Sequence, residues 1–297
     1  MYIVSMKFIN RIWFKVLTLL IAAAGIPLII FHMISINEAG RTVIQTMERD
    51  RKFAAKRGAD EIKLFLDRTV QIVRNTARHI ETMKLSDWQK ETLLMDLTLS
   101  NGDLYRKAYL VDKTGRIIVS TQGVPAELGK KESRFFHGLK DRGRPRISGV
   151  EFSAKKSPLF TVCVPVRKSG KPYAFLIATV NLRDIWGICD RIDFSGTPYY
   201  FRTIRDGGAI LMDSRGFIIA HWDRTRVFKN IDPNLFSAIV SRTADKTFHL
   251  EYVSERAGKR YISCTPVSAP GFSEPWRLIV DQPLDEAFSL MRAMRWK

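Results

Sequence analysis

The stretch at residues 110–120, Leu-Val-Asp-Lys-Thr-Gly-Arg-Ile-Ile-Val-Ser, occurs again at residues 211–221 as Leu-Met-Asp-Ser-Arg-Gly-Phe-Ile-Ile-Ala-His. At this shift of 101 residues, Leu, Asp, Gly and both Ile residues are identical. In each copy an apolar segment runs into Asp-x-x-Gly, which is typical of a tight hairpin turn, and a second apolar segment returns. The pattern predicts the same β-hairpin twice.

The repeat continues beyond the hairpin. Cys163-Val164-Pro165-Val166 matches Cys264-Thr265-Pro266-Val267 at the same shift, and one inserted residue later Leu176-Ile177 matches Leu278-Ile279 and Leu182 matches Leu284. Two copies do not make a solenoid. The sequence therefore contains two related modules of roughly one hundred residues, predicted at 101–191 and 192–284.

Each module is rich in Val, Ile, Thr and aromatic residues, with short glycine turns such as Ser169-Gly170, and this favours antiparallel strands. Helical patterns follow both predicted sheets, at Leu182–Arg191 and Leu284–Arg295. A sheet with helices on its face gives an α+β fold.

An apolar segment lies near the N-terminus. Val16–Asn37 has 22 residues without a formal charge, enough for a helix to cross a bilayer. Lys7, Arg11, Trp13 and Lys15 precede it, as expected of a membrane-edge tail at residues 1–15. A signal peptide is the alternative, but its apolar region is usually shorter, about 7–15 residues. We predict one transmembrane helix at 16–37.

Basic residues flank the segment on both sides, so charge bias alone leaves its orientation open. A short cytoplasmic tail with the bulk of the chain outside is the commoner arrangement. We therefore predict an inner-membrane protein whose modules are extracytoplasmic.

A long helix is expected next, because residues 38–81 contain no proline. Apolar or small residues recur at helical spacing, at Ile44, Met47, Ala54, Gly58, Ile62, Phe65, Thr69, Ile72, Thr76 and Ile80. This stripe fits either packing along the chain's own modules or a homodimer seam. Ser86 is a plausible N-cap for a second helix that ends near Leu99, so residues 38–100 are predicted as a stalk.

Composition excludes several classes. The chain is 45% hydrophobic and 26% charged, which argues against a disordered, collagen-like or disulfide-scaffold protein. Its net charge of +18 favours anionic partners: lipid headgroups, nucleic acid or acidic small molecules. The three cysteines have no metal-binding spacing and are expected to be buried thiols. The five histidines include no helical pair for a metal, and no catalytic motif occurs. We expect no metal, no cofactor and no enzyme activity.

The ordered set of features resembles the double-Cache sensor domains of bacterial transmembrane receptors. The matching stretches are Leu110–Gly115, Ser133–Phe136 and Val164–Val166, then Leu211–Gly216, Ala220-His221 and Pro275–Leu284. The resemblance implies two PAS-like modules after a stalk helix, the first membrane-distal and ligand-binding, the second relaying the signal. It also implies that residues 285–297 lead toward a second span and an output domain, a kinase, chemotaxis rod or cyclase, which this sequence does not contain.

By this resemblance the ligand lies between the first sheet and the loop at about residues 120–148. Arg134 or Arg146 could hold a carboxylate through two parallel hydrogen bonds, and Phe135 and Phe136 could wall the pocket. Ser148 and Asn181 complete the predicted ligand-binding set. Amino-acid-binding members carry an arginine where this chain has Ser133 and an aspartate where it has Asn181, so a carboxylate is favoured over an amine. The alternative is that these cations form a solvated face.

The partners expected are a small, anionic ligand, membrane lipid and a second copy along the long helix, with no nucleic acid. Ligand closure would reposition that helix. Two other functions remain open from the sequence: a ligand-free membrane-tethered scaffold, and a basic nucleic-acid-binding protein.

Overall fold

The computed structural model describes residues 2–121, 128, 130–139, 143–153, 157–192, 208–242, 246–254, 258–268, 271 and 275–283. The chain divides into one unit formed by residues 1–49 with 287–297 and a second formed by residues 50–286. The predicted helix at Leu284–Arg295 lies outside the described residues.

The first unit contains the beginning of helix α1 (Tyr2–Thr82). Trp13–Ser35 is a helical segment of 23 residues with a mean hydropathy of 2.3, and none of it is buried. Pro27 lies inside the helix without ending it. Among the described residues this is the one helix long and apolar enough to cross a bilayer. It covers most of the span predicted at 16–37.

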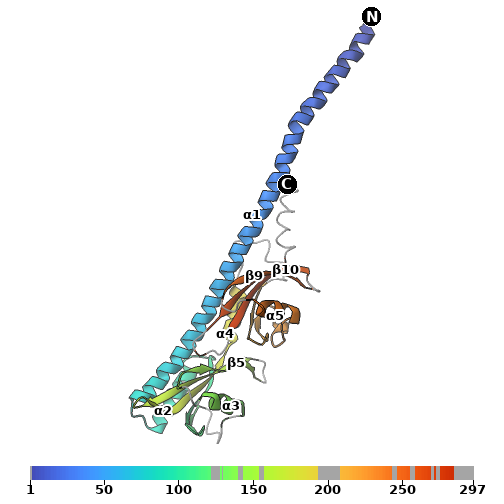
Figure 1. The fold of residues 1–297 in the computed structure, drawn as a ribbon. Helices are drawn as coiled ribbons and strands as arrows, with labels where there is room; N and C mark the ends of the chain where they lie inside the picture. Colours follow the sequence, from blue (N-terminus) through green and yellow to red (C-terminus); the bar gives the residue numbers. More distant parts are fainter. Residues whose placement is uncertain are drawn as a thin grey trace. The chain divides into compact units, whose positions relative to one another are not determined.

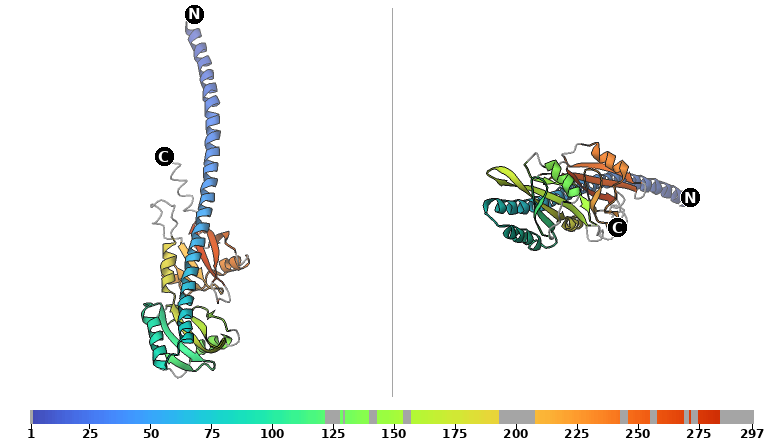
Figure 2. Two further views of the ribbon diagram at one scale, coloured as in Figure 1. Left: turned by 90° about the vertical axis from the view of Figure 1, so that its left-hand side faces the viewer. Right: turned by 90° about the horizontal axis from the view of Figure 1, so that it is seen from below.

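The second unit contains two antiparallel sheets (Figures 1 and 2). The first sheet has the order β2-β1-β6-β5-β3, with β4 also paired to β5. Its strands are β1 (Tyr105–Asp112), β2 (Ile117–Ser120), β3 (Arg146–Ile147), β4 (Glu151–Phe152), β5 (Pro158–Lys168) and β6 (Lys171–Asn181). Helices α2 (Asp87–Leu99), α3 (Lys130–Leu139) and α4 (Arg183–Arg191) accompany it.

The second sheet has the order β8-β7-β11-β10-β9. Its strands are β7 (Gly208–Met212), β8 (Ile218–His221), β9 (Phe248–Ser254), β10 (Gly258–Val267) and β11 (Trp276–Pro283). The 3-10 helix η2 (Arg224–Arg226) and helix α5 (Pro233–Val240) lie between β8 and β9 in the chain. The two sheets have the same strand order at β2-β1-β6-β5 and β8-β7-β11-β10, so the α+β fold with two PAS-like modules is confirmed.

The two hairpins agree in detail. The register of β1 against β2 shifts between Leu110 and Val111, and that of β7 against β8 shifts at the equivalent place, between Leu211 and Met212. Asp112 and Asp213 close the turns by accepting hydrogen bonds from backbone amides on the far side of the loop. Gly115 and Gly216 adopt φ of 92° and 81°, which the Asp-x-x-Gly turn requires.

Residues 50–82 of α1 pack along both sheets of this unit. The buried positions include Ala55, Ala59, Ile62, Leu66, Val70, Val73, Ala77 and Ile80. The stripe is therefore centred one residue later than predicted at several turns, so that Ala54, Phe65 and Ile72 are only half-buried. Gly58 marks a close approach: a Cβ there would lie 2.4 Å from Cδ1 of Ile192 and 2.9 Å from Cδ2 of Leu278. This part of the helix packs along its own modules.

Candidate functional site

The first sheet has two different faces. Along β6, Leu176, Ala178 and Val180 belong to the main core, which includes α1 residues. Because successive strand residues point to opposite faces, Thr179 and Asn181 lie on the other face with Phe175 and Ile177, in front of α3. All six residues predicted to bind ligand lie on α3 or on the strands and loops of this side. We call this surface the α3 face.

Helix α3 fills part of the α3 face with an aromatic side chain. Phe136 is fully buried, and its ring packs edge-on against Phe175 with centroids 5.2 Å apart. The same small cluster contains Tyr109, Val111, Ile117, Cys163 and Ile177. The sequence placed Phe136 in a pocket wall, but the structure places it in the core, where it fixes α3 to the sheet.

Four polar residues form a row beside this apolar cluster. The backbone amide of Ser148 donates to the carbonyl of Thr161, 2.8 Å away. Thr161 is the register partner of Thr179, and Thr179 is the register partner of Lys107. Ser148, Thr161, Thr179 and Lys107 thus cross four neighbouring segments of one sheet, and we call them the polar row.

Thr179 is the buried member of the polar row. Its side chain is 4% exposed, and its hydroxyl has no hydrogen-bond partner in the described part of the chain. A buried hydroxyl without a partner costs about 1–3 kcal/mol, so native proteins rarely keep one without a reason. The hydroxyl lies on the α3 face, and the described residues leave it without a hydrogen bond.

Lys107 supplies a positive charge at the end of the row. Its ammonium group forms an ion pair with Glu132 of α3 and lies 5.4 Å from the ring centroid of Tyr109. Burial alone would lower the pKa of Lys107, but the hydrogen bond and negative charge of Glu132 outweigh burial and raise it. Lys107 is consequently a cation at neutral pH, held by one carboxylate.

Arg146 and Asn181 lie at the borders of the row. Arg146 pairs with Cys163 in the sheet, and its Nη1 donates to the carbonyl of Gly138 in α3 at 3.2 Å. Asn181 is 3% exposed, and its Oδ1 accepts from the amide of Arg183 at 3.2 Å. Both residues are partly engaged in holding neighbouring segments, α3 and the start of α4.

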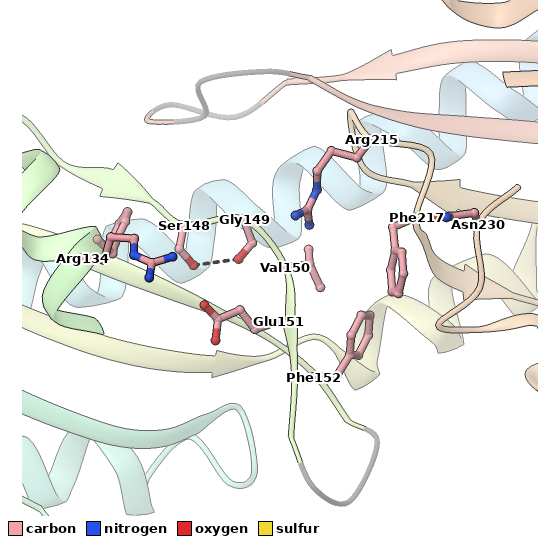
Figure 3. Close-up of a pocket in the computed structure, with 10 residues that line it drawn as sticks. Arg134, Ser148, Gly149, Val150, Glu151, Phe152, Arg215, Phe217 and Asn230 are labelled. Carbon is pink, nitrogen blue, oxygen red and sulfur yellow. Dashed lines mark hydrogen bonds between the residues drawn. The ribbon is translucent and has the colours of Figure 1, made fainter. Parts of the chain in front are cut away.

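A cleft of about 810 Å³ opens next to the polar row. Arg134, Phe135 and Ser148 line it, whereas Phe136, Arg146 and Asn181 do not. The remaining lining residues come from the segment Gly149–Phe152 and, across the cleft, from the second module: Arg215, Phe217 and Asn230 (Figure 3). The structure therefore separates the predicted residues into a group on the cleft and a group over the sheet.

The second module carries no such row. The register partners at the equivalent positions are Leu250, Ile262, Asp281 and Gly208. Asp281, the counterpart of Thr179, accepts a hydrogen bond from Nε of Arg260 at 2.7 Å, and both side chains are nearly buried. Burial raises the pKa of Asp281 although Arg260 opposes this. The position that is open in the first module is filled by an internal ion pair in the second.

Lys107, Glu132, Thr161 and Thr179 were missed from the sequence. Thr161 and Thr179 are isolated hydroxyl residues in largely apolar stretches of their strands, and Lys107 directly precedes the apolar run of β1. Alternation alone places each of them opposite the main core. The alternation could be seen in the sequence, but only the strand register shows that these residues are neighbours.

Side chains that could bind a metal ion do not gather in the described ranges. No group of three His, Cys, Asp or Glu side chains there could hold a metal ion. Cys163, Cys189 and Cys264 are buried free thiols, as expected, and burial raises the pKa of Cys189 and of Cys264 to about 12. Such thiols are unreactive.

Comparisons with known proteins agree with this architecture. The profile of a family described as the Cache domain matches residues 35–291. The ligand-binding domain of the Pseudomonas fluorescens chemoreceptor CtaA, in complex with L-isoleucine, is 17% identical with a TM-score of 0.62, covering 84% of this chain and 98% of that one.

The ligand-binding domain of the Pseudomonas aeruginosa amino acid chemoreceptor PctC, in complex with GABA, is 16% identical with a TM-score of 0.59, covering 76% of this chain and 95% of that one. An extracellular ligand-binding receptor from Desulfohalobium retbaense is 15% identical with a TM-score of 0.56, covering 77% of this chain and 39% of that one. A search of curated sequences gives no match. At these identities the structural likeness concerns the fold.

Proposed function

Because the chain belongs to the Cache domain family, we propose that it is a membrane-anchored sensor that binds a small carboxylate over the polar row of its first module. Cache domains are sensor modules, so the family supports ligand recognition rather than catalysis. The carboxylate and the route of the signal are our proposals.

The polar row is the observation that carries the proposal. Thr179 offers a buried hydroxyl without a partner in the described chain, and its register partner on the neighbouring strand is Lys107. Lys107, Arg134 and Arg146 on this side outnumber Glu132 and Glu151 among the described residues, which leaves a positive excess. An anion that accepts hydrogen bonds from Lys107 and Thr179 would satisfy both the charge and the hydroxyl.

The comparison between the modules supports the first one as the ligand-binding module. The equivalent row in the second module has two aliphatic residues, a glycine and an aspartate already neutralised by Arg260. An added ligand there would have to displace a buried ion pair, which leaves an uncompensated charge.

The similar structures support the chemistry only in outline. CtaA and PctC are described in complex with L-isoleucine and GABA, and each of those ligands contains a carboxylate. On the α3 face of this chain, the acidic side chain of Glu132 is already paired with Lys107. We therefore propose recognition of the carboxylate without a dedicated site for an amine.

Titration calorimetry on the full chain in nanodiscs would test this proposal. The probes are acetate, propionate, succinate, alanine and leucine. We expect heat from simple carboxylates, about tenfold or more weaker binding in Lys107→Met, and unchanged binding in Lys113→Met, a lysine at the exposed β1–β2 turn.

Three results would contradict the proposal: heat only from the zwitterionic amino acids, equal binding by Lys107→Met, or no binding to any probe together with no thermal stabilisation. The last result would favour a ligand-free scaffold, because a ligand that prefers the folded state must stabilise it by mass action.

We also propose an inner-membrane location with the modules outside the cell, and pairing of two copies along α1. Phe53 and Leu64, both 68% exposed, lie eleven residues apart on one face of the helix. Protease protection of intact spheroplasts tests the location, with digestion of the modules expected. Cysteine crosslinking at Phe53 tests the pairing, with Lys52 on another face as the control; equal crosslinking at both would refute it.

A further inference from the structure

The cleft beside the polar row has a chemistry of its own. Its described lining contains two arginines from different modules, three phenylalanines and one carboxylate, that of Glu151. Its volume of about 810 Å³ lies within the range of small-molecule sites. Positive charge beside aromatic surface is what an organic anion with an apolar body requires.

Arg215 is held in position for such a ligand. Its Nε and Nη2 donate to Oδ2 of Asp213 at 3.0 and 2.8 Å, while Asp213 also accepts from the amides of Arg215 and Phe217. The Asp213 side chain is 6% exposed and that of Arg215 is 69% exposed. A buried carboxylate thus fixes a guanidinium whose remaining donors are open to the cleft.

The duplicated turn shows that this arrangement is specific to the second module. In the first module Asp112 binds the amide and hydroxyl of Thr114 at 2.7 and 2.6 Å, so the equivalent turn is complete within itself. Arg215 occupies the place of Thr114. The same hairpin therefore holds a guanidinium group on its aspartate in the second module, where it borders the cleft, and a threonine hydroxyl in the first.

The opposite wall belongs to the first module. Arg134 of α3 is exposed and has no ion-pair or hydrogen-bond partner in the part of the chain that the structure describes. Figure 3 shows the guanidinium groups of Arg134 and Arg215 pointing toward the segment at Ser148 and Gly149 from opposite sides. Phe152 lies beyond it, with its ring centroid 5.3 Å from that of Phe217.

From this arrangement we infer that the cleft is a second ligand site for a small organic anion with an aromatic or aliphatic body, next to the polar row and sharing only Ser148 with it among the described residues. Its carboxylate would pair with Arg215 and its body would lie against Phe135, Phe152 and Phe217. A ligand bound there contacts both modules. It therefore binds more tightly to the arrangement of the modules in which Arg134 lies closer to Arg215.

Methyl NMR on the full chain in nanodiscs tests the inference with benzoate as the probe. Val150 lines the cleft, and Ile177 lies under the α3 face, so their methyl groups report on the two places separately. We expect roughly millimolar benzoate to shift Val150, and acetate or benzylamine at equal concentration to shift it far less. Arg215→Gln should weaken the response of Val150 about ten- to a hundredfold.

The controls separate this site from the polar row. Arg116→Gln removes an arginine from the equivalent turn of the first module and should leave the Val150 response unchanged. Lys107→Met removes the cation of the polar row and should also leave it unchanged. Asp213 keeps its two backbone hydrogen bonds in Arg215→Gln, and Arg215→Lys, which retains the charge but not the planar fork, should bind with intermediate affinity.

The inference is wrong if benzoate leaves Val150 unshifted, if benzylamine shifts it equally, or if Arg215→Gln binds as the unchanged chain does. A benzoate shift confined to Ile177 would also overturn it, and would place the probe on the polar row instead.

Discussion

Replacing Thr179 with valine should stabilise the ligand-free protein while weakening carboxylate binding. The two side chains are nearly equal in shape, both are β-branched, and both suit a strand. Thr179 is 4% exposed and its hydroxyl has no partner in the described chain. Removing an unsatisfied buried hydroxyl recovers part of a cost of about 1–3 kcal/mol, so we expect a gain of about 1 kcal/mol.

Urea unfolding of the full chain in detergent, followed by tryptophan fluorescence, measures this change. A gain of about 1 kcal/mol corresponds to a rise of roughly 2–4 °C in Tm for a protein of this size. Thr265→Val is the matched control. Thr265 is also nearly buried in a central strand, but its hydroxyl lies 3.2 Å from that of Thr247, so its loss should destabilise by about 1 kcal/mol.

The two substitutions are expected to change stability in opposite directions. If Thr179→Val destabilises as much as Thr265→Val, the Thr179 hydroxyl is satisfied in the ligand-free protein. The reason for placing a ligand against it would then be lost. If stability rises but carboxylate binding by calorimetry is unchanged, the hydroxyl is open and the ligand lies elsewhere.

Three further predictions concern the core and the charges. Phe136→Ala should lower the free energy of unfolding by about 3–5 kcal/mol, because it empties a fully buried site. Phe135 is half-buried, so Phe135→Ala should lower it clearly less. Urea unfolding measures both changes. Asp281→Ala should cost about 3–5 kcal/mol, because it removes the carboxylate that pairs with the buried guanidinium group of Arg260, while the double change Arg260→Met with Asp281→Leu should cost less in the same assay. Burial lowers the pKa of His221 to about 4, so folding should lose up to about 3 kcal/mol as pH falls from 6.5 to 4, measured as Tm against pH.

The sign for His221 follows from proton binding. Between pH 6.5 and 4 the unfolded chain binds a proton at this residue and the folded chain does not, so acid favours unfolding. His221→Asn offers an acceptor in place of the Nδ1 that binds the amide of Asp223, and should flatten this part of the profile. An unchanged profile would show that other groups cause the loss of stability in acid.

The other two predictions have their own refuting results. Equal effects of Phe135→Ala and Phe136→Ala would contradict the first. A double Arg260 and Asp281 variant as unstable as the single Asp281 variant would contradict the second.

Local chemistry in the sequence determined much of the fold. Asp112 and Asp213 each close a turn through hydrogen bonds within four residues, and the bulge lies at the same place in both copies. The predicted N-cap Ser86 immediately precedes α2, and its amide donates to Oε1 of Gln89 at 2.9 Å. Such features are formed by residues that are close in the chain, so the local sequence pattern is enough to predict them.

Packing details required the tertiary structure. The stripe on α1 was placed about one residue early at several turns, since spacing alone does not decide whether Ala54 or Ala55 faces the sheets. Phe135 and Phe136 are adjacent and chemically identical, yet one lines the cleft and the other fills the core. The direction in which α3 faces its sheet makes that difference.

The sequence by itself determined the duplicated hairpins, the apolar N-terminal helix, the long second half of α1 and the basic character of the segment around Arg134, which was expected as a loop and forms helix α3. Only the tertiary structure decided that Ser148, Thr161, Thr179 and Lys107 form one row, and that Arg215 lies across a cleft from Arg134. The residues of the polar row are far apart in the chain, and the register of antiparallel strands brings them together. A shift of one residue in that register would turn the shifted strand's side chain to the opposite face of the sheet. Arg134 and Arg215 come from a helix and a turn of different modules, so the packing of those modules places them at one cleft.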